Sequence, residues 1–117
     1  MINILKTMKA NTNSELTKEV IDIILDEAGE SDEEIIAYLE NVTIHGCATG
    51  TVSSLIYYSD TEAFFDRHVD EIFDLYNEAK AEYGEMDIEL SRNNLAWFGF
   101  ETMAQNILYE LESANEF

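Results

Sequence analysis

The chain of 117 residues contains no proline, one cysteine and five glycines, and each shortage excludes a class of protein. The scarcity of turn-forming residues disfavours a sandwich or barrel of many short strands. A single cysteine excludes an intramolecular disulfide framework and a cysteine-rich zinc module. No apolar run approaches the ~20 residues that cross a bilayer, and no apolar segment follows Lys6 and Lys9 as it would in a signal peptide. We therefore expect a soluble protein in a reducing, intracellular setting.

Basic residues are also scarce, because 6 Lys and Arg face 25 Asp and Glu, for a formal net charge of −19. Such an anion repels phosphates, so neither nucleic acid nor an anionic membrane is expected as a direct partner. The apolar fraction of 46% is ordinary for a globular protein and argues against disorder. We expect residues 1–117 to form a single acidic helical domain with one modest core.

Apolar residues recur at helical spacing in four segments of the chain. The expected helices span residues ~14–28, ~32–43, 60–83 and ~91–113. Residues 51–58 fit a helix or a buried strand, and we favour a helix because no partner strand is evident. Residues 1–12 are expected to form a short amphipathic turn or a loose arm. The predicted fold is all-α, a compact bundle of four to five helices.

Capping residues and glycines set the expected helix boundaries. Three pairs have the spacing of a capping box, in which each side chain satisfies an orphan N–H of the first turn. These pairs are Thr12 with Glu15, Ser31 with Glu34 and Ser59 with Glu62. Gly29 and Gly84 follow apolar runs, at positions typical of a helix C-terminus. The predicted apolar face of the longest helix consists of Phe65, Val69, Ile72, Phe73, Tyr76, Ala79 and Tyr83.

The predicted helix over residues 60–83 carries an acid at every fourth position. This acidic series consists of Glu62, Asp66, Asp70, Asp74, Glu78 and Glu82. Each step rises about 6 Å along a helix, and each like-charged pair at this spacing costs roughly 0.2–0.5 kcal/mol. A sequence selected only for stability would alternate these acids with cations. The first expected helix repeats the theme with Glu15, Glu19, Asp22 and Asp26.

Regularly spaced negative charge resembles the phosphates of a nucleic-acid strand. Duplex DNA carries one charge per ~1.7 Å, so a net charge of −19 corresponds to about 11 base pairs. We therefore expect these acids to bind the basic nucleic-acid-binding groove of another protein. The alternative is a solvated surface that aids solubility, or the acidic proteome of a salt-loving host. Because each step drifts by about 40° around the helix, not every acid of the series meets one flat partner.

Candidate catalytic and metal-binding residues are few. His45 and Cys47 lie two positions apart and would suit a thiol nucleophile with a base, but no third, orienting residue is identifiable. Together with His68 they offer three metal ligands without the paired spacing of a zinc motif. We expect His68 to border the core instead. The sequence predicts no catalytic residue, no metal site and no cofactor.

Aromatic residues cluster near the start of the last expected helix. Trp97, Phe98 and Phe100 are most simply core residues, and Glu101 beside them is an exposed helix position or, less favoured, a general acid. Three neighbouring aromatics are also typical of an interface anchor. The second hypothesis is accordingly a non-catalytic interaction or assembly protein, or a homodimer, that binds through this aromatic surface.

Two segments resemble an uncharacterised family of small bacteriophage proteins, known only as a domain of unknown function. They read HGCATGTVSSLIYYSDTEAFF over residues 45–65 and LAWFGFE over residues 95–101. The resemblance implies a phage or prophage origin and a location in the cytoplasm of the bacterial host, and it assigns no activity. Small acidic phage proteins often inhibit host defence. The leading hypothesis is a non-enzymatic inhibitor of a host CRISPR effector or restriction enzyme, and a small Cys/His enzyme is the less favoured alternative.

Overall fold

The computed structural model describes residues 2–45, 61–84 and 90–115, and every regular element in these ranges is an α-helix. The helices are α1 (Ile2–Asn11), α2 (Glu15–Glu27), α3 (Asp32–His45), α5 (Thr61–Arg67), α6 (Val69–Tyr83) and α7 (Arg92–Asn115). The all-α prediction is confirmed for these residues, whereas the predicted number of helices is too low. The helix expected over residues 51–58 and the cap at Ser59 lie outside the described ranges.

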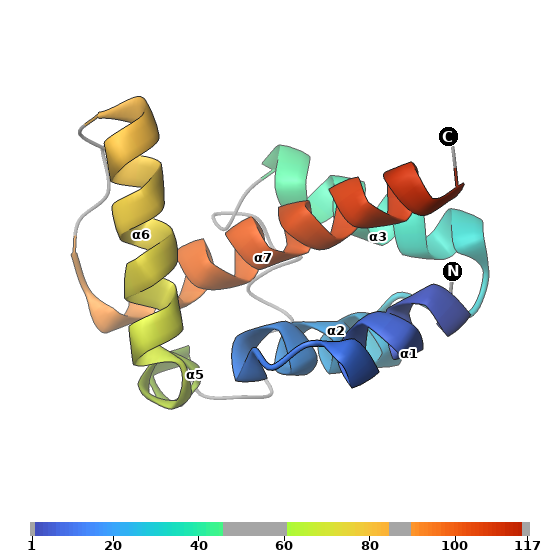
Figure 1. Ribbon diagram of the computed structural model, residues 1–117, viewed down its shortest axis with the longest axis horizontal. Helices are drawn as coiled ribbons and strands as arrows, with labels where there is room; N and C mark the ends of the chain where they lie inside the picture. The colour runs from blue at the N-terminus through green and yellow to red at the C-terminus, as the bar shows by residue number, and fades with distance from the viewer. Residues whose placement is uncertain (1, 46–60, 85–89, 116–117) are drawn as a thin grey trace.

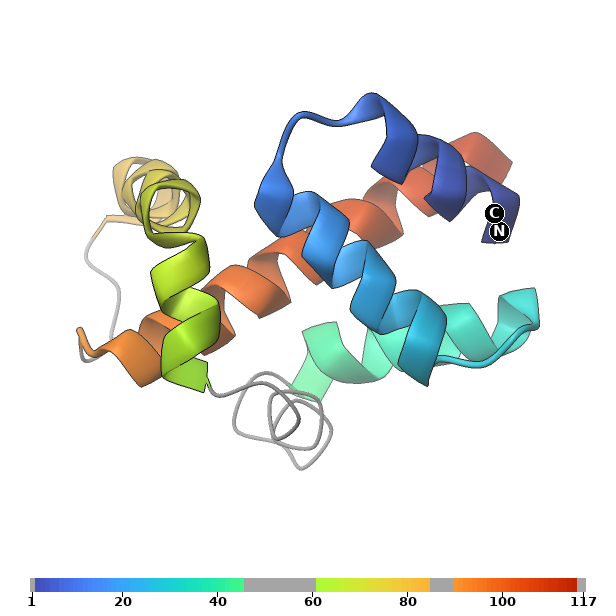
Figure 2. The same cartoon turned by 90° about the horizontal axis from the view of Figure 1, so that it is seen from below.

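The last helix, α7, is the one around which the others pack (Figure 1). It crosses the molecule and contacts α2, α3, α5 and α6, while α1 lies against α2 (Figure 2). Its buried residues are Leu95, Ala96, Phe100, Ala104, Ile107, Leu108 and Leu111. These residues join the buried side chains of the other helices in one hydrophobic cluster. The Cα radius of gyration of 13.6 Å is close to the value of about 13 Å expected for a compact chain of this length.

The first ten residues differ from the expected turn or loose arm, because Ile2–Asn11 forms a regular helix. Leu5 is fully buried, and Ile4 and Met8 pack against the core. Lys9 Nζ also lies 2.6 Å from Asp22 Oδ1 on α2. A helix this short is marginal in isolation. Docking on α2 therefore supplies stability that the local sequence does not reveal.

The N-terminus of α2 is capped by a different residue from the one predicted. Ser14 is the N-cap, and its Oγ accepts a hydrogen bond from Thr17 N at 3.0 Å. Thr12 Oγ1 accepts from Ser14 N at 3.1 Å, so the predicted capping box of Thr12 with Glu15 is wrong. The side chain of Thr12 forms a local turn before the helix instead of capping its first turn.

Other predicted helix ends are confirmed. Ser31 Oγ accepts from Glu34 N at 3.1 Å, so the Ser31 half of this predicted capping box forms at the start of α3, while the Glu34 carboxylate accepts from the Ser31 hydroxyl at 3.0 Å. Gly29 follows α2 with a φ of +96°, and Gly84 ends α6 with a φ of +84°. Glycine adopts such left-handed conformations without the steric cost that a Cβ imposes.

The single helix predicted over residues 60–83 is two helices, α5 and α6, with His68 between them. His68 has a φ of −129° and a ψ of 25°, outside the helical region, and the two helices run in clearly different directions (Figures 1 and 2). The predicted apolar face is therefore wrong in part: Val69, Phe73 and Tyr83 are exposed. Phe64, which the pattern leaves out, is buried.

A close approach between α6 and α7 depends on Gly99. A Cβ at this position would lie 2.6 Å from Ile72 Cγ1 and 3.0 Å from Ile72 Cδ1. We expect Gly99→Ala to lower the free energy of unfolding by about 1–2 kcal/mol, because overpacking outweighs a gain of about 1 kcal/mol in helix propensity. Urea unfolding measures the change. In an Ile72→Ala background the same substitution should cost less; an equal cost in both backgrounds would contradict this contact.

Candidate functional site

The predicted partner-binding acids lie on three different helices. Those on α2 are Glu15, Glu19, Asp22 and Asp26; those on α5 are Glu62 and Asp66; those on α6 are Asp70, Asp74, Glu78 and Glu82. The sequence predicted that the acidic series follows one continuous helix, but the series is divided between α5 and α6. The few cations of the chain neutralise some of these acids and leave others exposed.

The two acids on α5 are paired with Arg92, the first residue of α7. Arg92 Nη1 lies 2.6 Å from Glu62 Oε2, and Arg92 Nε donates to Asp66 Oδ1 at 3.2 Å. Arg92 Nη2 also donates to Asp66 Oδ2. This arrangement fastens α5 to the start of α7. Glu62 and Asp66 thus have a structural role, and the single charge of Arg92 offsets part of their combined negative charge.

Glu19 joins α2 to the junction of α5 and α6. Arg67 donates to both oxygens of Glu19, from Nε and from Nη2, each at 2.9 Å. His68 Nε2 lies 3.1 Å from Glu19 Oε1. The His68 residue is only 6% exposed and packs edge-on against Phe64 at 5.1 Å. The expectation that His68 borders the core is confirmed.

The contacts of Glu19 with Arg67 and His68 lower its pKa. Burial raises the pKa of Glu19, but the hydrogen bonds and charges of Arg67 and His68 outweigh burial and hold it below its usual value of 4.5. The cluster therefore stabilises the fold above that value, and its contribution is lost as the pH falls through the lowered pKa.

We expect the free energy of unfolding of the Glu19→Gln variant to fall less on acidification than that of the unsubstituted protein. Glutamine keeps a hydrogen-bonding side chain but cannot bind a proton in this pH range, so the linkage to Arg67 and His68 disappears. Urea unfolding of the two proteins between about pH 3 and 7 measures the effect. Asp26→Asn is the control, since Asp26 is exposed and has no ion pair in the described part of the chain. Equal pH dependences for Glu19→Gln and the unsubstituted protein would contradict the assignment.

Glu71 on α6 has a structural role that the sequence did not predict. Its Oε2 accepts from Ser14 Oγ at 2.5 Å and from Leu16 N at 3.2 Å. Its Oε1 accepts from Glu15 N at 3.1 Å. A carboxylate from α6 thus caps the first turn of α2, where the helix dipole favours negative charge. No local pattern signals this role, because Ser14 lies 57 positions away.

Two of the acids on α2 form exposed ion pairs. Asp22 Oδ1 lies 2.6 Å from Lys9 Nζ, and Glu15 Oε1 lies 3.3 Å from Lys18 Nζ. Exposed pairs of this kind contribute about 0–1 kcal/mol. Their effect on a partner is to reduce the net charge that the surface of α2 offers.

The remaining acids of the series form an unneutralised surface on α6, which we call the α6 acidic face. It consists of Asp70, Asp74, Glu78 and Glu82, all of them exposed. Within residues 2–45, 61–84 and 90–115, no ion pair involves any of these four side chains. The three helical steps between them span about 18 Å. Together with the exposed Asp26 on α2, this surface is the part of the predicted binding site that forms no ion pair within the described residues.

The aromatic cluster predicted as an alternative anchor is largely core. Phe100 is fully buried, and Trp97 and Phe98 are half-buried. Phe98 packs edge-on against Tyr76 at 6.0 Å, and Trp97 contacts the hydrophobic cluster. Glu101, which is half-buried, lies on the side of α7 that faces α6.

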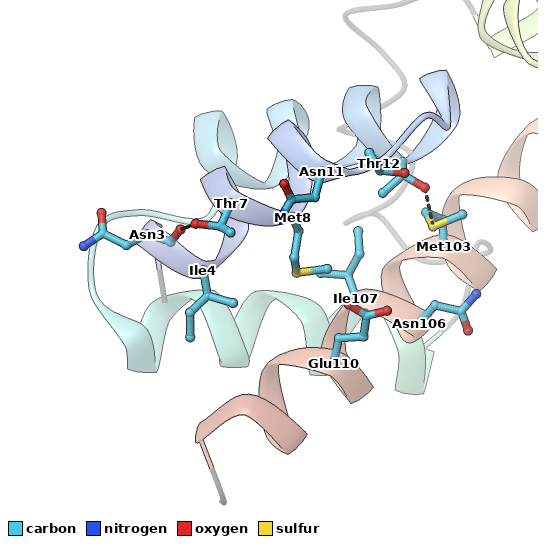
Figure 3. A pocket seen from close by; sticks show the side chains of 11 residues that line it. Asn3, Ile4, Thr7, Met8, Asn11, Thr12, Met103, Asn106, Ile107 and Glu110 are labelled. Carbon is cyan, nitrogen blue, oxygen red and sulfur yellow. Dashed lines mark hydrogen bonds between the residues drawn. The ribbon is translucent and has the colours of Figure 1, made fainter.

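A hollow of about 720 Å³ lies between α1 and α7 (Figure 3). Its apolar lining includes Ile4, Met8 and Ile107. Met103 Sδ lies 3.3 Å from Thr17 Oγ1 at one end. Amide and hydroxyl side chains and the carboxylate of Glu110 surround it, and its lining contains neither histidine nor cysteine.

Metal binding and thiol chemistry find no support in the described residues. Among them, no three His, Cys, Asp or Glu side chains lie together as they would around a metal ion. Cys47 lies outside the described ranges, and although α3 ends at His45, the side chain of His45 is not described. The pairing of these two residues thus stays a prediction. No described helix combines the length and apolar character needed to cross a bilayer.

Comparison with known proteins identifies the family of the chain. The sequence profile of a family described as Domain of unknown function (DUF7222) matches residues 6–113, and the chain belongs to this family. Comparisons with curated proteins and with solved structures find no match. The match agrees with the predicted resemblance to a family without an assigned activity.

Proposed function

We propose that this protein is a non-catalytic inhibitor that binds the basic nucleic-acid-binding groove of another protein. The α6 acidic face is the main contact surface in this proposal. The observation that carries it is the distribution of charge. Arg67 and Arg92 neutralise acids at helix junctions, whereas the four acids of the α6 acidic face have no such partner among the described residues.

The cost of this distribution favours a role in binding. The α6 acidic face contains three like-charged pairs at four-residue spacing, which together destabilise the helix by about 0.6–1.5 kcal/mol. A cationic partner would relieve this repulsion and release counterions. The net charge of −19 would also steer the protein towards such a partner at low salt.

We further propose a phage or prophage origin, action in the bacterial cytoplasm, and a CRISPR effector or restriction enzyme as the target. The support for this origin is the resemblance of residues 45–65 and 95–101 to small phage proteins. The support for the target class is chemical, since such enzymes hold nucleic acid in grooves lined with Lys and Arg.

Competitive elution tests this function. The full chain is immobilised, exposed to bacterial lysate at low salt, and eluted with duplex DNA or with a salt step. We expect a nucleic-acid-binding protein to be released by DNA, and the free inhibitor to block its binding of DNA. A captured protein that stays bound in the presence of saturating DNA would contradict the proposal.

A second candidate function is assembly through aromatic side chains. Tyr83 is 75% exposed and Tyr109 is 58% exposed, and aromatic rings are enriched at protein–protein interfaces. Trp97 and Phe98, the anchors that the sequence suggested, are half-buried and leave less ring surface for a partner than Tyr83 and Tyr109 do. Binding that is insensitive to salt would favour this second function.

A further inference from the structure

A groove lies beside the α6 acidic face. The C-terminal ends of α6 and α7 point apart (Figure 1), and a groove of about 430 Å³ lies between the two helices. This volume falls within the range of about 300–1,000 Å³ that is typical of ligand sites. Its half-buried lining includes the apolar side chains of Leu75, Ala79 and Phe98.

Exposed carboxylates, aromatic rings and the amides of Gln105 and Asn106 border this groove. Glu78 and Glu82 belong to the α6 acidic face, and Tyr83 and Tyr109 are the two most exposed aromatic residues of the described chain. Tyr109 Oη accepts a hydrogen bond from Gln105 Nε2 at 3.2 Å, which orients its ring at the edge of the groove. Carboxylates and aromatic rings thus converge on one concave surface, whose half-buried lining combines the apolar side chains with Glu101 and Thr102.

We propose that this groove receives an arginine-bearing segment of the basic partner, an inference that rests on the proposed function. The carboxylates attract a cation, and a guanidinium also stacks on aromatic rings. The apolar interior would cover the methylene groups of the same side chain. Lysine carries an equal charge but stacks less well. The groove therefore favours arginine over lysine, which the acids alone would not do.

Charge complementarity excludes the other occupants. A nucleic acid would also stack on tyrosine, but its phosphates would meet Glu78 and Glu82. A second copy of this chain, with a formal net charge of −19, would meet the same repulsion. A neutral apolar segment would leave both carboxylates facing an uncharged surface. A cationic segment is the occupant that satisfies all of the exposed groups.

Two matched peptides test this inference with the full chain. An arginine octapeptide and a lysine octapeptide are titrated into the protein by calorimetry at low salt. We expect the arginine peptide to bind more tightly. The double variant Tyr83→Ala with Tyr109→Ala should weaken it by about five- to thirtyfold and remove most of the preference for arginine. Both tyrosines are exposed, so the variant should fold normally.

A charge control locates the binding surface. The variant Glu78→Gln with Glu82→Gln should weaken the binding of both peptides. The variant Asp26→Asn with Glu30→Gln, at and just after the C-terminal end of α2, should have a smaller effect. Three results would overturn the proposal that this groove binds arginine. They are equal affinity for the two peptides, no measurable binding of either peptide, and no effect of the tyrosine substitutions on binding. The proposed function fails separately, if neutralising the α6 acidic face leaves competition with DNA unchanged.

Discussion

Neutralising the α6 acidic face should abolish inhibition of the target while leaving the fold intact. The variant carries Asp70→Asn, Asp74→Asn, Glu78→Gln and Glu82→Gln. If each acid makes one ion pair with the partner, worth about 0.5–1 kcal/mol, the affinity falls by about 30- to 1,000-fold. The dependence of binding on salt should flatten as well, because fewer counterions are released. Titration calorimetry at two or more salt concentrations measures both effects.

The same variant should be at least as stable as the unsubstituted protein. It removes three like-charged pairs, although Asp70 lies in the first turn of α6, where a negative charge is favourable. A loss of binding with unchanged or increased stability therefore separates recognition from folding. The matched control removes four exposed acids at the other end of the molecule, with Asp26→Asn, Glu27→Gln, Glu30→Gln and Glu33→Gln. Equal losses of affinity in both variants would mean that binding depends on the net charge of the protein and not on the position of the acids on α6.

Removing the carboxylate of Glu71 should destabilise the protein by about 2–3 kcal/mol. Glu71→Ala deprives the Ser14 hydroxyl and two N–H groups of the first turn of α2 of their acceptor. Hydrogen bonds to charged acceptors contribute more than neutral ones, and loss of a helix cap costs about 0.5–2 kcal/mol. Urea unfolding followed by circular dichroism gives the change in free energy. Substituting an exposed acid of α6 by alanine should change the free energy of unfolding much less.

Two further variants separate this cap from a general effect of charge. Asp74→Ala on the same helix should change stability little, because Asp74 is exposed and has no ion pair in the described residues. Combining Ser14→Ala with Glu71→Ala should cost less than the sum of the two single changes, since both disrupt one network. Additive costs would show that Glu71 does not act through Ser14.

Local patterns predicted the parts of the fold that local interactions determine. The helices expected over residues ~14–28 and ~91–113 agree within about two residues with α2 and α7, because apolar periodicity and Gly29 mark them. The break at His68 was not predictable in this way. It contains neither proline nor glycine, and the contacts of His68 with Glu19 on α2 hold it. A helix-breaking position defined by a distant carboxylate leaves no local signature.

The sequence predicted exposed acids at the candidate site, but it did not predict which of them form ion pairs or which residues share a groove. Spacing alone placed the acids of α6 at the surface, since polar residues on amphipathic helices face solvent. It did not reveal that Arg92 forms ion pairs with both Glu62 and Asp66, because that pairing needs α5 to lie on α7. Nor did it bring Tyr83 and Tyr109 to one groove, since those residues lie on separate helices.

The central position of α7 has a consequence for the synthesis of the protein. Four earlier helices bury their apolar surface against residues 92–115, which leave the ribosome after them. The nascent chain therefore exposes these hydrophobic side chains until residues 92–115 have been synthesised, and a stop before residue 92 would yield a polypeptide that lacks the buried residues of α7. The strong negative charge of the emerging chain would keep such unfolded copies apart by mutual repulsion during that interval.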